Sequence, residues 1–148
     1  MPNTPALVGE GMTAACANDA VTEEEKEYAL KILRSFGKVE IVAENMIDAV
    51  VAVSGSAPAY VFMFIEAMAD AAVSEGMPRK QAYEFAAQVS LRKCKDGARY
   101  GKTSGRIKDM VCSPAGTTIE AVRVLEEKGL RSAVIEAMKV CADKSRKM

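Results

Sequence analysis

Apolar positions recur with helical spacing through most of the chain, and only the first forty or so residues depart from that pattern. Two short runs, 12–16 and 38–42, are typical of strands, and the segment between them has the spacing of a helix. Thr22 and Glu25 at its beginning form the pattern of a capping box. The chain is therefore predicted to begin as strand, helix, strand.

A pair of strands is marginal in water when it stands alone. We therefore expect these two strands to close the edge of a sheet whose other strands lie outside the 148-residue sequence. On this interpretation Met1 corresponds to an internal methionine, and the N-terminus is incomplete.

From residue 44 onward the pattern predicts about six helices, separated by breaks that contain Gly, Ser or Pro. The expected ranges are 44–53, 57–75, 78–99, a short helix that carries Ile107, Met110 and Val111, 118–128 and 131–144. Ser56 is a candidate N-cap, and Gly101 and Gly105 are expected to bracket a loop. The predicted fold class is mainly α, a short remnant of an α/β domain followed by a bundle of about six helices.

The second of these helices is apolar nearly all round, which normally means full burial or membrane insertion. Glu66 and Asp70 lie one turn apart within it and argue against a membrane span, since two carboxylates would enter the bilayer. We interpret them as acids on the helix surface rather than as a catalytic pair. The neighbours that such a helix needs could be the other five helices or a second subunit.

Composition narrows the possible partners. Twenty basic and twenty acidic residues give a net charge of zero, so no broad field attracts nucleic acid or an anionic membrane. The four cysteines are widely spaced and the chain has no histidine, so no metal site is expected. Without a secretory leader, the thiols indicate a reducing, cytoplasmic location. Cys112 is interpreted as a buried structural thiol, because no histidine can activate it.

One loop combines small residues with the start of a helix, in the run Ser113-Pro114-Ala115-Gly116-Thr117-Thr118. Backbone N–H groups and the positive end of the helix dipole converge at such a place, which favours a carboxylate or a phosphate. Gly116 would let the anion approach the main chain, and Ser113 and Thr118 would add hydroxyl groups.

The alternative interpretation of the same loop is purely structural. Thr117 followed by Glu120 has the spacing of a capping box, in which the helix start satisfies itself and binds nothing. The residue types leave both interpretations open.

The sequence contains little that indicates a nucleotide-binding site. Gly9-Glu10-Gly11 is the only glycine pattern near the beginning, and no strand of sufficient length precedes it. No acidic residue follows at the position expected for a ribose contact. A dinucleotide site at this run is therefore not expected.

Three segments resemble the pyrroline-5-carboxylate reductase family in order and spacing, over nearly all of the chain. Residues 1–12 resemble the segment that leaves its nucleotide-binding domain, and 48–60 and 108–118 resemble its second signature and its substrate-binding signature. Ala57 and Ala115 stand where the family has glycine. The methyl group of Ala115 would narrow the pocket.

The resemblance implies an oxidoreductase of proline biosynthesis that reduces 1-pyrroline-5-carboxylate to L-proline with NADPH or NADH. It implies that Ser113, Gly116, Thr117 and Thr118 bind the substrate carboxylate, with the Thr118 hydroxyl facing the ring nitrogen as the catalytic group. Asn3 would lie near the nicotinamide end of the cofactor; its alternative role is that of a turn asparagine.

The resemblance also implies how the chain is organised. Residues 1–43 would be the C-terminal end of a Rossmann-type domain, and 44–148 a helical domain that binds substrate and intertwines in a homodimer, with further assembly into a ring of dimers. The phosphate-binding domain would precede Met1, so this chain alone is expected to be inactive. The residues leave two other hypotheses open, a silent helical dimerisation module and a small-anion-binding domain.

Overall fold

The computed structural model describes residues 1–100 and 103–148 of the protein. Contacts divide the chain into two compact units. The first contains residues 1–60 and 135–148, and the second contains residues 61–134. Each unit is described by itself.

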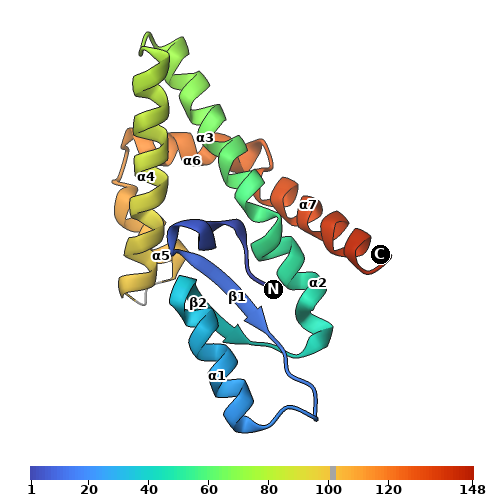
Figure 1. The fold of residues 1–148 in the computed structure, drawn as a ribbon. Coiled ribbons are helices and arrows are strands. Elements are labelled where there is room, and N and C mark those ends of the chain that lie inside the picture. Colours follow the sequence, from blue (N-terminus) through green and yellow to red (C-terminus); the bar gives the residue numbers. More distant parts are fainter. Residues whose placement is uncertain (101–102) are drawn as a thin grey trace. The chain divides into compact units, whose positions relative to one another are not determined.

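The first unit contains a two-stranded parallel sheet with a crossover helix (Figure 1). Its elements are the 3₁₀ helix η1 (Thr4–Val8), strand β1 (Gly11–Ala15), helix α1 (Glu23–Leu33), the 3₁₀ turn η2 (Arg34–Phe36) and strand β2 (Gly37–Ile41). Gly11 pairs with Gly37 and Ala15 with Ile41. The predicted strand–helix–strand beginning is confirmed, with strand ends one residue earlier than expected.

Two local features explain this arrangement. A Cβ on Gly37 would lie 2.1 Å from the carbonyl oxygen of Gly11, so the strands approach too closely there for a side chain. The predicted capping box is present at α1, because Thr22 Oγ1 accepts a hydrogen bond from Glu25 N at 3.3 Å. Glu25 Oε2 in turn accepts one from Thr22 N at 2.9 Å.

The other edge of β1 contacts the start of the chain. Met1 N donates to Ala14 O at 2.6 Å, and Ala14 N donates to Met1 O at 3.1 Å. Two residues that exchange both bonds form an antiparallel pair. Thr13, which precedes Ala14, is fully buried, and its Oγ1 has no hydrogen-bond partner within the described part of the chain.

The next helical run agrees with the predicted helices at 44–53 and 57–75, but the expected break between them is reduced to a bend at Ser56. It consists of the 3₁₀ turn η3 (Glu44–Met46), helix α2 (Ile47–Val50), the π-helix η4 (Val51–Gly55) and helix α3 (Ala57–Ser74). Ser56 N donates to Val51 O at 2.9 Å, so the Ser-Gly-Ser segment is accommodated as a widened turn. By length and composition alone, 44–74 is the one described helical run able to cross a membrane, which is weak evidence for a span.

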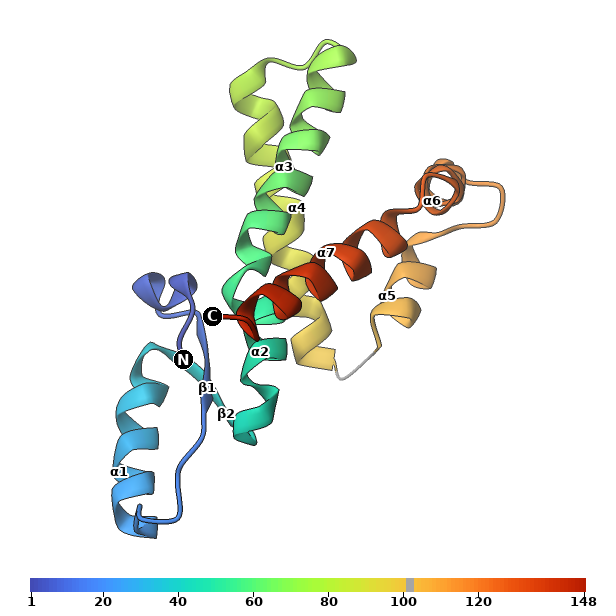
Figure 2. The same cartoon turned by 90° about the vertical axis from the view of Figure 1, so that its right-hand side faces the viewer.

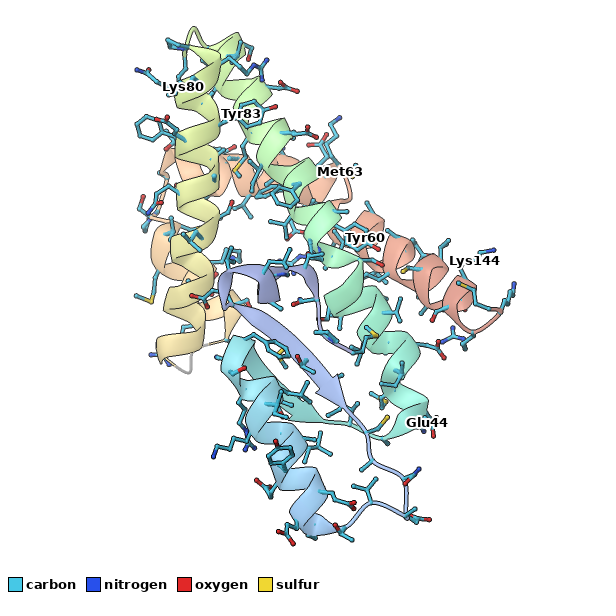
Figure 3. The ribbon with its side chains drawn as sticks, viewed as in Figure 1. Glu44, Tyr60, Met63, Lys80, Tyr83 and Lys144 are labelled. Atoms are coloured by element: carbon cyan, nitrogen blue, oxygen red, sulfur yellow. The ribbon has the colours of Figure 1, made fainter. Side chains whose placement is uncertain are left out.

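Helix α7 (Leu130–Ser145) completes the first unit with its residues from 135 onward. Ser145 Oγ donates to Asp48 Oδ1 at 2.6 Å, and Ser56 Oγ lies 3.1 Å from Cys141 Sγ. A groove of about 900 Å³ lies here, and Tyr60 and Lys144 on its lining are labelled in Figure 3. Burial, followed by the hydrogen bond with Cys141, raises the pKa of the Tyr60 hydroxyl.

The second unit contains the hairpin of α3 and α4 (Arg79–Tyr100), drawn in green and yellow in Figure 1. The helices pack through small side chains, since Ala69, Ala82 and Ala86 form the buried cluster. The Asp70 carboxylate pairs with Arg79 across the turn. Asp70 and Glu66 are both exposed.

Helices α5 (Ser104–Val111) and α6 (Thr117–Glu127) follow in the second unit. Gly105 lies inside α5 and not in the predicted loop, because Thr103 caps the helix by accepting a bond from Arg106 N at 3.4 Å. Gly101 lies outside the described residues. Cys112 is the C-cap of α5 and is half-buried rather than buried.

Large apolar side chains remain exposed along these helices. Among the described residues, the buried hydrophobic side chains are Leu30 and five alanines. Phe62, Met63 and Phe85 on α3 and α4 keep 66%, 67% and 68% of their surface exposed. Within each described unit, these large side chains of α3 and α4 are therefore not covered by a neighbouring helix.

The capping box at α1 gives a testable prediction. Hydrogen bonds from the Thr22 backbone and side chain lower the pKa of the Glu25 carboxyl below its ordinary value of 4.5. The capping box therefore stabilises the fold fully above pH 4.5, and this stabilisation is lost as the pH falls and Glu25 becomes protonated. Thr22→Ala should cost about 1 kcal/mol at pH 7 and less at pH 3, as measured by thermal unfolding. Thr22→Ser, which keeps the hydroxyl, should behave as wild type; an equal loss for Thr22→Ala at both pH values would contradict the role of Glu25.

Candidate functional site

A tight turn joins α5 to α6, and Figure 2 shows this connection in orange. Gly116 N donates to Ser113 O at 3.1 Å, which closes the turn. Pro114 occupies its second position, and Ala115 occupies the third with a φ of 56°. This combination is typical of a type II turn, in which the third residue needs a positive φ.

Ala115 is the one non-glycine residue with positive φ in the described part of the chain. A Cβ in this region costs roughly 1–2 kcal/mol, which is why glycine is preferred there. Ala115 stands where the resembled family has glycine, and the positive φ gives the physical reason for glycine at this position.

The start of α6 differs from the capping-box interpretation. Its N-cap is Gly116, with φ −81° and ψ 168°, and Thr117 is already the first helical residue. The Glu120 carboxylate accepts a bond from Arg123 Nε at 3.1 Å instead of returning to the helix start. Because Gly116 has no side chain, it cannot cap the first N–H groups of the helix.

The Ser113 hydroxyl lies directly beside this helix start. A Cβ on Gly116 would come within 2.2 Å of Ser113 Oγ, so glycine makes room for the hydroxyl. The turn thus brings Ser113, Gly116, Thr117 and Thr118 together. Thr118 is half-buried, whereas Ser113 and Thr117 are exposed.

One expected donor is already engaged. The Gly116 N–H bonds to the Ser113 carbonyl, so it does not face an incoming anion. The backbone donors that the helix leaves unpaired by its own ladder are those of Thr117, Thr118 and Ile119. Gly116 therefore leaves room for an anion next to the main chain, and the N–H groups of the residues that follow it are the candidate hydrogen-bond donors.

The cationic side chains of Lys108 and Arg131 are each paired with a carboxylate. The Lys108 amine on α5 donates a hydrogen bond to the Asp109 carboxylate, which raises the pKa of Lys108, and Arg131 pairs with Glu126. The charge that favours an anion at the turn is therefore the partial positive charge of the α6 N-terminus.

Asn3 belongs to the other unit and has a different environment. Its Nδ2 donates to Ser54 O at 3.2 Å and to Ser54 Oγ at 3.1 Å, while Met12 N donates to Asn3 Oδ1 at 2.9 Å. Sequence reasoning missed this partnership, because 51 positions separate the two residues. Within the described residues, no group of His, Cys, Asp and Glu could hold a metal ion.

Comparisons with a family model and with curated proteins find the same kind of relative. Residues 44–148 match the family described as "Pyrroline-5-carboxylate reductase dimerisation". The Escherichia coli pyrroline-5-carboxylate reductase is 63% identical over all 148 residues, and the pea enzyme is 38% identical. The match covers 55% and 54% of these relatives, so the chain spans about half of their length.

Two solved structures resemble the fold closely. The Plasmodium falciparum pyrroline carboxylate reductase with NADP bound matches with a TM-score of 0.92 and 33% identity, covering 99% of this chain and 60% of that one. The Coxiella burnetii pyrroline-5-carboxylate reductase matches with a TM-score of 0.95 and 34% identity, covering 99% of this chain and 55% of that one.

The packing of Ser113 against Gly116 can be tested by a double-mutant cycle. Gly116→Ala should destabilise the protein by about 1 kcal/mol or more, because the new methyl group overlaps Ser113 Oγ. In a Ser113→Ala background the same substitution should cost less, since the nearest remaining atom is the Ser113 carbonyl oxygen at 3.2 Å. Chemical denaturation of the four proteins measures both values; equal costs in the two backgrounds would show that the hydroxyl does not lie there.

Proposed function

Because the chain belongs to the pyrroline-5-carboxylate reductase dimerisation family, we propose that it forms the C-terminal half of an enzyme that reduces 1-pyrroline-5-carboxylate to L-proline. The observation that supports this proposal most directly is the start of α6, where Gly116 leaves the first N–H groups uncapped beside a serine hydroxyl. A helix N-terminus of this kind binds carboxylates.

The substrate carboxylate would accept hydrogen bonds from Ser113 Oγ and from the N–H groups of Thr117 and Thr118. These three donors are close in sequence and belong to one rigid turn, so little conformational entropy is lost when the anion binds. Gly116 would allow the carboxylate to approach the main chain.

The Thr118 hydroxyl would face the imine nitrogen of the ring. NADPH or NADH, when bound, supplies the hydride that adds to the imine carbon, and the nitrogen gains a proton. A hydroxyl is a weak acid, so Thr118 would orient the imine or relay a proton that comes from water. It would therefore be the catalytic residue of this chain.

The cofactor would be held mostly by an N-terminal dinucleotide-binding domain, of which residues 1–43 would be the end and 44–148 the helical partner. Asn3 fits a role at its nicotinamide end, because the two bonds to Ser54 and the one from Met12 leave one lone pair of Oδ1. That lone pair can accept a bond from an amide N–H. Without the rest of the cofactor site, this chain alone would not turn over.

We further propose that the helical domain forms a homodimer in the cytoplasm. Obligate dimer interfaces are large and resemble a domain core cut in half. Exposed Phe62, Met63 and Phe85 would supply the apolar part of such an interface.

Thr118 can be tested in a full-length reductase that carries this chain as its C-terminal half. Thr118→Ala should lower kcat by about tenfold or more, because a hydrogen bond that strengthens in the transition state is lost. Thr118→Ser, which keeps the hydroxyl, should restore most of the rate in a steady-state assay. An unchanged kcat for Thr118→Ala would remove this residue from the mechanism.

Ser113→Ala should act differently from Thr118→Ala. Loss of a charge-assisted bond should raise KM for the imine by about tenfold with little change in kcat. An unaltered KM would contradict carboxylate binding at the turn.

Thermal unfolding in the presence of phosphate or proline separates the reductase proposal from a general anion site. If phosphate stabilises the protein against heat more than proline does, the site is a general anion site and the reductase proposal is wrong.

A further inference from the structure

The hydrogen bonds between Asn3 and Ser54 join two parts of the chain that lie 51 positions apart in the sequence. Asn3 precedes β1, and Ser54 lies in the π-helix η4, inside the region that matches the dimerisation family. Asn3, Met12 and Ser54 are all half-buried. Their three hydrogen bonds have lengths of 2.9 to 3.2 Å.

The backbone explains why Ser54 needs an outside donor. In a regular α-helix the carbonyl of residue 54 would accept a bond from the N–H of residue 58. Residue 58 is proline and has no N–H, and the next amide, that of Ala59, donates to Ser56 O at 3.1 Å. The Asn3 carboxamide supplies the missing donor.

The same bonds fix which way the carboxamide points. Met12 N–H needs an acceptor, and Ser54 O needs a donor, so exchanging the oxygen and nitrogen of Asn3 would break both interactions. The remaining lone pair of Oδ1 therefore has a defined position.

We propose that Ser54 is a positioning residue for the dinucleotide cofactor, acting through Asn3. Ser54 holds the Asn3 carboxamide so that Oδ1 accepts a hydrogen bond from an amide N–H, the group that a nicotinamide carboxamide carries. This inference rests on the proposed function. Ser54 would thereby give the helical domain a role in cofactor binding, separate from the role of the Ser113–Thr118 turn in substrate binding.

The test is the dissociation constant of NADP⁺ by calorimetry, in a full-length reductase that carries this chain. Ser54→Ala removes one of two acceptors and should weaken NADP⁺ binding by about threefold. Asn3→Asp places a second acceptor against the oxygens of Ser54 and should weaken it by about tenfold or more. Ser54→Thr, which keeps the hydroxyl, should restore the wild-type value.

Ser56→Ala is the matched control. It removes a hydroxyl two positions away that contacts Cys141 and not Asn3, so NADP⁺ affinity should not change. Unchanged NADP⁺ affinity in Ser54→Ala, even with a lower Tm, would overturn the inference. Wild-type protein that binds NADP⁺ but reduces no cyclic imine would contradict the proposed function alone, and the affinity series would still decide the role of Ser54.

Discussion

The structure depends on apolar surface that the described part of the chain does not bury by itself. Its helices approach one another through alanines, as Ala69, Ala82 and Ala86 do between α3 and α4, and Ile65, Met68 and Val73 pack against that cluster. Phe62, Met63 and Phe85 stay largely exposed. Alanine contacts allow close helix packing but remove little apolar area from water. We propose that a second copy of the chain covers these exposed side chains and supplies the hydrophobic free energy that their burial gives.

The proposed substrate site follows from one backbone requirement. Pro114 and the positive φ of Ala115 reverse the chain, and Gly116 then starts α6 without a side chain. This geometry directs the Ser113 hydroxyl toward the first turn of the helix. A site made of backbone donors is rigid and neutral, so it can select a small carboxylate without a cationic side chain of its own in the turn.

Sequence patterns predicted the elements well where local signals agree. Thr22 and Glu25 located the start of α1, and two short β-rich runs located both strands. The break expected at Ser54-Gly55-Ser56 is reduced to a bend at Ser56, because a π turn takes Ser54 and Gly55 into the preceding helical segment. At Thr117 the capping-box alternative is wrong, since Gly116 takes the N-cap position and Glu120 pairs with Arg123. The bond from Asn3 to Ser54 had no local signal, because it depends on a carbonyl left without a donor by Pro58.

The most direct test of the account is the mass of the folded chain in solution, measured by sedimentation while helix content is followed by circular dichroism during dilution. The account predicts a mass of two chains, or of a multiple of two, and loss of helix as the assembly dissociates. A monomer that keeps its helix content on dilution would contradict it, because that chain would be stable with Phe62, Met63 and Phe85 exposed to water.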